Sequence, residues 1–521
     1  MRVAPEMAFD LETDVIVVGY GFAGGIAAIE AADAGARVIL LEKMPDPGGI
    51  SVCSAGSARS ARSFEDAFAY LKATNAGRTP DDVLEELAHG MAGIEGYLTR
   101  LAGNCGLTVS SSLSRDRKTG ANYPLPGWET FYHTLVDDIP GFDPKQAYPH
   151  VAGLAGGRRL FHVLERNIAQ RPAISVKLSS PVKRLIAGGA PGAAEVMGVE
   201  LEVEQGLRRI KACKGVVLAC GGFECDEETK RQFWQMTPVL PAMGRQNTGD
   251  GIRMAQSMGA KLWHMWHYHG AYGFRHPKAD AGGFPYGIRM KRLPDWVPGV
   301  DARSRAQMAW ILVDADGKRF MNEMPPYTQD TGARPFEFFD TQRQRFPRLP
   351  AHMICDEDGR RMYRLADVCF NERGLDFAWS EDNLAEVEAG ILKRANSIAE
   401  LAALIGADEA VLADSIERWN AACQAERDSD FARPSGSFTP IRTPPYYTAE
   451  VWPVLSNTQG GPVHDSHQRI IDAEGKPIAR LYAAGEMGSA FGHLYMSGGN
   501  ITECFVTGRI AGTEAAALAP L

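Results

Sequence analysis

Short runs of β-branched and other apolar residues alternate with alanine-rich stretches of helical period in the first half of the chain. The runs at 15–18, 38–41 and 216–219 predict buried strands, and the stretches at 25–34 and 83–101 predict helices. Alternation of this kind is typical of an α/β fold built on a doubly wound parallel sheet.

The middle of the chain breaks this rhythm. From about residue 263 to residue 350 the sequence is rich in aromatic residues, proline, glycine and arginine, a loop-heavy composition suited to a binding surface. The stretch 397–423 then has apolar residues at near-helical spacing around a break at Gly406, which predicts packing helices. A second domain is therefore expected to begin near residue 263.

After residue 444 the α/β character returns, with a strand predicted at 481–485 and a helix at 500–517. We therefore expect a discontinuous Rossmann-like domain. Its first part is residues 1–262 and its return segment is residues 444–521, with an inserted α+β substrate or capping domain at 263–443.

Charge and composition exclude several classes of protein. The 521 residues include 55 basic and 64 acidic side chains, a net charge of −9, without a lysine or arginine run, so nucleic acid is not an expected partner. No signal-peptide pattern and no apolar segment long enough for a membrane span is found. The nine cysteines form no CxxC pair and fit reduced thiols, which favours a cytoplasmic location.

The strongest local motif joins the first strand to the first helix. The apolar run at 15–18 leads into Gly19, Gly21 and Gly24, and Glu42 ends the following strand. In this pattern the glycines permit a tight turn, close approach of a pyrophosphate and close helix packing, while the acid accepts a hydrogen bond from a ribose hydroxyl. The motif predicts dinucleotide binding but does not by itself separate FAD from NAD.

Four further blocks follow this motif, at 47–51 (PGGIS), 219–223 (ACGGF), 247–251 (NTGDG) and 484–486 (AGE). In this order the blocks resemble those of the flavoprotein family of soluble fumarate reductases, succinate dehydrogenase flavoprotein subunits and 3-ketosteroid dehydrogenases. The resemblance implies bound FAD along a path formed by Gly19, Gly21, Gly24, Glu42, Gly49, Ser51, Gly222, Asp250, Glu486 and Asn500. The helix after Asn500 would direct its N-terminus at the flavin ring and stabilise an anionic reduced flavin.

The same resemblance bears on how FAD is held and reduced. Ile50 stands where succinate dehydrogenases carry the histidine that attaches FAD covalently, so noncovalent FAD is expected. A second nucleotide-binding motif is not found, so a separate electron acceptor or donor is implied.

The substrate side departs from the dicarboxylate reductases. Asn457 and Met496 stand in the segments where those enzymes hold carboxylates with a histidine and an arginine. By resemblance, Arg360 corresponds to their proton-donating arginine and Glu323 to their relay glutamate. The next basic member of the relay is replaced by a segment that ends in Tyr327.

The late segment is similar to that of the ketosteroid dehydrogenases, where a tyrosine and a backbone N–H four residues later polarise the substrate carbonyl. Tyr495 and Gly499 have this spacing. Two preorganised donors would stabilise the enolate charge that develops when an α-proton is removed. The alternative for Tyr495 is a buried ring with a satisfied hydroxyl, and Ser497, a further candidate, has the alternative of a turn residue.

The base that removes the proton is left open among Tyr327, Tyr268 and Tyr123, with Tyr327 favoured. His269 aligns near the substrate-binding histidine of the fumarate reductases. Although His267 and His269 would share one face of a strand, no further ligand is spaced to complete a metal site, so none is predicted.

Together these features predict an FAD-dependent enzyme that acts on a CH–CH bond next to a carbonyl, by desaturation of a ketone or reduction of an enone. The expected substrate is a small molecule, an apolar cyclic ketone or enone. Two alternatives stay open: a reductase of an unsaturated carboxylic acid that uses Arg360 and His269, and a non-catalytic flavin-binding or electron-transfer protein.

Overall fold

The apolar run predicted at 15–18 lies at the end of β1 (Leu11–Val18) in the computed structural model of the chain. The structure describes residues 8–113, 120–188, 195–203, 206–277, 286–292, 307–375 and 377–521. Two compact units are found. Unit 1 comprises residues 1–233, 244–268 and 457–521, and unit 2 comprises residues 234–243 and 269–456.

Unit 1 is built on a largely parallel sheet. Its parallel core has the order β23-β10-β1-β2-β7, and three further strands pair at the side of β10 and β23. The strands are β1, β2 (Val38–Leu41), β7 (Ile174–Lys177), β8 (Val182–Gly188), β9 (Glu195–Val203), β10 (Gly206–Leu218), β22 (Arg469–Ile471) and β23 (Pro477–Ala483). The central strands are almost fully buried runs of valine, isoleucine and leucine, as expected for a parallel sheet covered on both faces.

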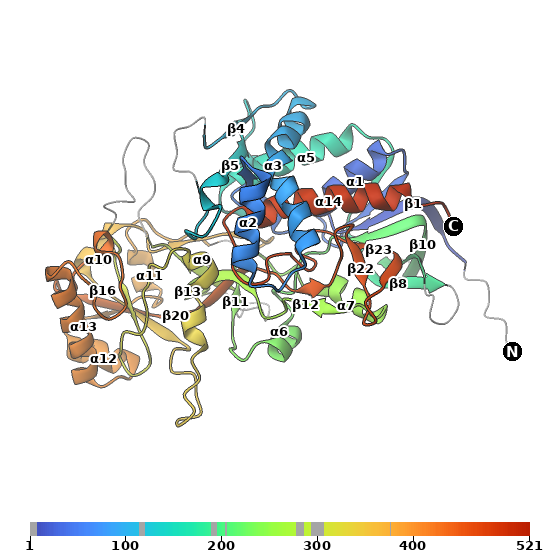
Figure 1. Cartoon of the computed structure of the whole chain (residues 1–521). Helices are drawn as coiled ribbons and strands as arrows, with labels where there is room; N and C mark the ends of the chain where they lie inside the picture. The colour runs from blue at the N-terminus through green and yellow to red at the C-terminus, as the bar shows by residue number, and fades with distance from the viewer. Residues whose placement is uncertain are drawn as a thin grey trace. The chain divides into compact units, whose positions relative to one another are not determined.

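Helices α1 (Phe22–Asp33) and α14 (Gly499–Ala517) run side by side in unit 1 (Figure 1). The close approach depends on two glycines of α14. A Cβ at Gly508 would lie 2.6 Å from the Ala23 carbonyl oxygen, and one at Gly512 would lie 2.3 Å from that of Ala27. Because neither position has room for a side chain, the pair of helices is fixed at short range.

The other helices of unit 1 are α2 (Phe64–Asn75), α3 (Asp81–Gly103), α4 (Pro144–Ala147), α5 (Ala155–Ala169), α6 (Glu227–Phe233) and α7 (Asp250–Ser257). A small antiparallel sheet of β3 (Ser57–Ala61), β4 (Val109–Ser111) and β5 (Phe131–Val136) accompanies them. Within the described residues, no helix is long and apolar enough to cross a bilayer.

Unit 2 contains a second, mixed sheet with helices packed beside it. Its strands are β11 (Leu240–Pro241), β13 (Tyr268–Arg275), β14 (Gly287–Met290), β15 (Ile311–Val313), β16 (Ala351–Asp356), β17 (Ala366–Asp367), β19 (Lys393–Ala395) and β20 (Tyr446–Thr458). Its helices are α9 (Thr328–Thr331), α10 (Glu357–Met362), α11 (Leu384–Glu388), α12 (Ile398–Ile405) and α13 (Glu409–Gln424). Apolar side chains of β15, β16, α12 and α13 form a shared core.

The predicted α/β fold class is confirmed, with the Rossmann-like sheet in unit 1 and an inserted α+β unit 2. The break predicted at Gly406 is also present, because this residue ends α12 in the left-handed conformation, at φ 73°. The loop-heavy interpretation of 263–350 is wrong in part, since this segment supplies β13, β14 and β15. Its stretches at 278–285 and 293–306 lie outside the described residues.

Candidate active site

Two of the motif glycines, Gly19 and Gly24, lie so close to neighbouring backbone that a side chain would not fit. Gly19 has φ +105°, and a Cβ there would lie 2.3 Å from the carbonyl oxygen of Ala219. A Cβ at Gly24 would lie 1.8 Å from the carbonyl oxygen of Gly19. Glycine is therefore required at both positions, as predicted for a turn that brings a ligand close to the backbone.

The N-terminus of α1 carries no negative side chain. Gly21 is its N-cap residue, and its first turn contains no acid. The Phe22 N–H donates to Ser51 Oγ at 3.1 Å, so Ser51 lies directly at the helix end. Gly49, two residues earlier, adopts a left-handed conformation at φ +48°. Backbone N–H groups and the positive end of the helix dipole suit this helix end to a phosphate group.

Glu42 lies beside this turn with its carboxylate held by two backbone groups. It accepts hydrogen bonds from the Tyr20 N–H at 3.0 Å and the Met44 N–H at 2.8 Å. Burial raises the pKa of Glu42 above its usual value. A fixed acid at the end of β2 is the acceptor that a ribose hydroxyl requires.

Asp250 takes part in an ion-pair network, which the sequence analysis did not foresee. Its carboxylate pairs with Lys43 Nζ at 2.6 Å and with Arg253 at 2.5 Å, and it accepts from the Thr248 hydroxyl at 3.0 Å. Lys43 follows Glu42 directly. The contacts that the structure gives Asp250 therefore fix Lys43 next to the dinucleotide motif.

A third acidic group, Glu486, lies half-buried in the segment between β23 and α14. Burial raises the pKa of Glu486, and the charges of the neighbouring Glu224 and Glu503 raise it further. Burial also raises the pKa of Glu224 and of Glu503 to about 7. The Glu486 carboxyl forms no hydrogen bond with a described residue, so it is available to a ligand that bears hydroxyl groups.

Gly222 follows β10, whose carboxyl end lies at the same edge of the parallel sheet as the carboxyl end of β23. A Cβ there would lie 1.9 Å from Thr458 Oγ1, and the hydroxyl of Thr458 accepts from the Phe223 N–H at 3.0 Å. Gly222 therefore permits close contact between the segment that follows β10 and the end of β20.

Tyr495 is buried just before α14, with its hydroxyl at the N-terminus of that helix. The Asn500 N–H donates to Tyr495 Oη at 3.3 Å. The predicted partner donor is engaged elsewhere, because the Gly499 N–H donates to the Met496 carbonyl at 3.0 Å. The four-residue spacing therefore brings the Tyr495 hydroxyl to the helix end, but through Asn500 rather than beside a Gly499 donor.

The turn between Tyr495 and α14 is fixed by two residues that the sequence analysis missed. Arg59 donates through Nε to the Ser497 carbonyl at 2.7 Å, and the Ser497 N–H donates to Asn122 Oδ1 at 2.8 Å. Ser497 thus contributes its backbone to the turn. Arg59 and Asn122 lie hundreds of positions away in the sequence, and no local pattern marks them.

The side chain of Asn500 bridges several polar groups of unit 1. Its amide nitrogen donates to Gln459 Oε1 at 3.0 Å and to Glu503 Oε2 at 2.9 Å, and its oxygen accepts from Asn457 Nδ2 at 3.2 Å. Asn457 and Met496, the residues that stand for the carboxylate-binding pair of the dicarboxylate reductases, are both buried and uncharged.

In unit 2 the structure joins two residues that the sequence analysis named separately. Tyr327 Oη lies 3.2 Å from His269 Nε2, and the two rings are stacked with centroids 6.0 Å apart. His269 belongs to β13, and Tyr327 is the N-cap residue of α9. A phenol in hydrogen-bond contact with an imidazole can pass its proton to it, which suits a base. The other two base candidates, Tyr268 and Tyr123, are both buried in unit 1.

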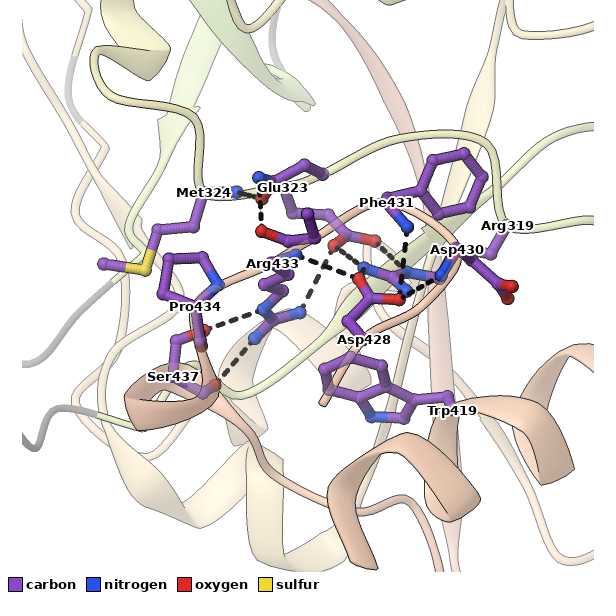
Figure 2. A network of polar contacts seen from close by, with 12 residues as sticks. Arg319, Glu323, Met324, Trp419, Asp428, Asp430, Phe431, Arg433, Pro434 and Ser437 are labelled. Atoms are coloured by element: carbon purple, nitrogen blue, oxygen red, sulfur yellow. Dashed lines mark hydrogen bonds and ion pairs between the residues drawn. The ribbon is translucent and has the colours of Figure 1, made fainter. Parts of the chain in front are cut away.

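Glu323 lies between two guanidinium groups (Figure 2). Arg319 donates to both of its oxygens, at 2.9 and 2.7 Å, and Arg433 Nη1 lies 3.4 Å from Oε2. Arg319 also pairs with Asp428 at 2.9 Å and lies over the Trp419 ring. All of these side chains are buried. Glu323 is therefore part of a closed ionic network in the core of unit 2.

Arg360 is engaged in the same manner on α10. It forms a two-point ion pair with Glu357, at 2.8 and 2.6 Å, and Nη1 donates to the Asp382 carbonyl. This ion pair holds the pKa of Glu357 at about 2. Arg360 and Glu323 thus lie in two separate networks, and each is already paired with a side chain of opposite charge.

Comparison with known proteins also indicates a flavin-binding protein. Residues 14–502 match the family model described as FAD binding domain. Digoxin reductase of Eggerthella lenta is 28% identical over 98% of this chain and 88% of its own length. The cytochrome-containing fumarate reductase of Shewanella frigidimarina is 28% identical, with 96% of this chain and 77% of the relative covered.

The 3-oxosteroid 1-dehydrogenase of Mycobacterium tuberculosis is 26% identical over 96% of this chain and 97% of its own length. The solved structure of 3-ketosteroid delta1-dehydrogenase from Sterolibacterium denitrificans superposes with a TM-score of 0.77 at 22% identity, with 97% of this chain and 99% of that chain covered. The chain belongs to the FAD-binding family.

The flavoprotein is an FAD-dependent oxidoreductase, as its relatives are, and its residues fit the cofactor. The N-terminus of α1 suits the pyrophosphate, Glu42 a ribose hydroxyl, and Glu486 the hydroxyls of the ribityl chain. The first turn of α14, like that of α1, contains no acid, so its positive end suits an electron-rich ring.

We expect the flavoprotein to release intact FAD when it is precipitated with acid, because Ile50 stands where covalent attachment needs a histidine. The measurement is the absorbance spectrum and chromatographic retention of the flavin in the supernatant. Flavin that stays in the washed pellet, and that proteolysis releases only as a flavin peptide, would show a covalent bond and contradict the prediction.

Proposed function

We propose that this flavoprotein acts on a CH–CH bond next to a carbonyl, by desaturation of a cyclic ketone or by the reverse reduction of an enone. The observation that carries the proposal is the Tyr495 hydroxyl at the N-terminus of α14. There it accepts the Asn500 N–H at 3.3 Å. A hydroxyl that accepts from the end of a helix donates more strongly, which suits a carbonyl oxygen on which negative charge develops.

FAD, when bound, supplies the acceptor for the hydride that leaves the β-carbon. Tyr495 donates a hydrogen bond to the carbonyl oxygen, which makes the α-hydrogen more acidic. Tyr327 accepts the α-proton and His269 Nε2, 3.2 Å away, takes the phenolic proton in turn. The substrate thus loses one proton and one hydride, and its Cα–Cβ single bond becomes a double bond.

The Gly499 N–H, predicted as the second donor, would have to leave the Met496 carbonyl before it contacts substrate. We therefore assign the main carbonyl contact to Tyr495. Electrons leave or reach the flavin through a separate small or protein partner.

A dicarboxylate is the less favoured substrate. Met496 and Asn457 offer no charge where a carboxylate would bind, and Arg360 and Glu323 are already paired with side chains of opposite charge. A buried carboxylate without such a partner would be strongly disfavoured. These contacts favour the ketone chemistry over reduction of an unsaturated diacid.

The proposal is tested by anaerobic mixing of the holoenzyme with a panel of reactants. Cyclic ketones are expected to bleach the oxidised flavin, or cyclic enones to reoxidise the flavin after dithionite reduction. Fumarate is expected to reoxidise the reduced flavin at least about 100-fold more slowly than an enone does, because a charge-assisted partner for its carboxylates is lost. The rate of the flavin absorbance change is measured. Rapid oxidation by fumarate with no response to any ketone or enone would overturn the proposal.

A further inference from the structure

Arg292 follows β14 and points its guanidinium at the start of α9. Nη1 donates to Thr328 Oγ1. Among the residues that the structure describes, no carboxylate pairs with this guanidinium. The side chain is partly buried, and burial lowers its pKa. Arg292 is therefore a cation without a matching anion in the described part of unit 2.

The positive charges of other arginines in the interior of unit 2 are stabilised by carboxylates, carbonyls or aromatic rings of the protein. Arg319 and Arg360 each form a two-point pair with a glutamate. Arg348, which like Arg292 has no ion pair with a described residue, donates to the Pro335 carbonyl at 2.6 Å and lies over two phenylalanine rings. By comparison, Arg292 has one hydroxyl contact, an arrangement that costs stability and is retained where a ligand supplies the anion.

The surroundings of Arg292 connect it to the proposed base. Thr328, its hydrogen-bond partner, is the residue after Tyr327. The phenol groups of Tyr272 and Tyr327 lie close enough to the guanidinium to influence its pKa. The backbone is fixed as well, because the Tyr363 hydroxyl donates to the Arg292 carbonyl. The cation is thus held in place beside the Tyr327–His269 pair.

We propose that Arg292 binds a carboxylate of the substrate, which makes the substrate class a cyclic ketone that bears one carboxylate group. A guanidinium presents two parallel N–H donors and matches a carboxylate in both geometry and charge. The proposal rests on the proposed ketone chemistry and narrows it. It differs from the dicarboxylate alternative because one cation is provided, beside a tyrosine base, and not two.

The test is a binding titration of the oxidised holoenzyme, followed through the change in flavin absorbance. The probes are cyclohexanones with a carboxylate at carbon 3 or carbon 4, each beside its methyl ester. The wild-type enzyme is expected to bind an acid more tightly than its ester. In R292Q the affinity for the acid is expected to fall about 10- to 100-fold, as for a lost hydrogen bond to a charged group, while the affinity for the ester stays the same.

R394Q is the matched control, since Arg394 is an exposed arginine on β19 of the same unit. It is expected to leave both affinities unchanged. Melting temperatures separate recognition from a structural role: R292Q is expected to melt no lower than the wild type, because it removes an uncompensated cation.

Three outcomes would overturn the proposal. They are no preference of the wild-type enzyme for the acid, including no binding of either probe; an equal loss of acid and ester in R292Q; and a preference for the acid that persists in R292Q. The comparison of acid and ester in the wild-type enzyme does not depend on any variant. If neutral ketones bleach the flavin but acids have no advantage, the ketone chemistry stands and the role of Arg292 fails.

Discussion

Replacement of Tyr327 by phenylalanine is expected to lower the rate of flavin reduction by a ketone about 10²–10⁴-fold, the usual contribution of a general base. The variant keeps the ring that stacks on His269 but loses the hydroxyl that lies 3.2 Å from Nε2. FAD content is expected to be unchanged, because Tyr327 belongs to unit 2 and the cofactor residues belong to unit 1. The rate is measured anaerobically in single turnover.

His269→Asn provides a second arm for this prediction. If His269 acts through Tyr327, the double variant should be no slower than Tyr327→Phe alone, since residues that act as a unit are not additive. Tyr447→Phe is the control, because it removes another hydroxyl of unit 2, one that donates to Glu357 at 2.7 Å. Tyr447→Phe is expected to react within a factor of about three of the wild-type rate. A Tyr327→Phe rate in the same range would exclude Tyr327 as the base.

Tyr495→Phe is expected to reduce the same rate about 10²–10³-fold, the usual effect of removing one donor from an oxyanion site. The hydroxyl lies at the N-terminus of α14, where it accepts from Asn500, and its ring packs edge-on against Phe491 with centroids 5.2 Å apart. Phenylalanine preserves this packing. The chemical step should therefore slow much more than the melting temperature falls.

The matched control for Tyr495 is Tyr97→Phe. Tyr97 is another buried tyrosine of unit 1, and its hydroxyl donates to Glu30 at 2.7 Å. Both variants lose one hydroxyl, and only Tyr495→Phe is expected to lose rate. If the two variants reduce their flavin at similar rates with full FAD occupancy, the Tyr495 hydroxyl has a packing role, and the carbonyl contact belongs to another residue.

The local elements of the fold could be predicted because their causes are local. The apolar run at 15–18, the contact of Gly24 with Gly19 and the helix break at Gly406 all act within a few residues, and each is present in the structure. The strands in 263–350 were missed, because aromatic residues, proline and glycine also mark loops. There the pairing of β13 with β14, and of β15 with β16, decides the structure.

The candidate site was less predictable because its contacts join distant positions. His269 and Tyr327 were each named from the sequence, but they are 58 positions apart, and no local pattern indicates their contact. The ion pair of Asp250 with Lys43 and the two-point pair of Arg360 with Glu357 are likewise side-chain contacts that no motif announces. Arg292 carries no sequence signal at all, because its unusual feature is a missing partner.

The product of one anaerobic turnover tests the proposed ketone chemistry. The oxidised holoenzyme is mixed with a cyclic ketone deuterated at its β-carbon, the flavin absorbance is followed, and the organic product is quantified by mass spectrometry; the reverse reaction uses reduced enzyme and the enone. One enone is expected to form, or to be consumed, per flavin, and the deuterated ketone is expected to reduce the flavin more slowly than the unlabelled ketone. The ketone chemistry would be contradicted if ketones did not reduce the flavin and enones did not reoxidise it, while fumarate oxidised the reduced flavin rapidly.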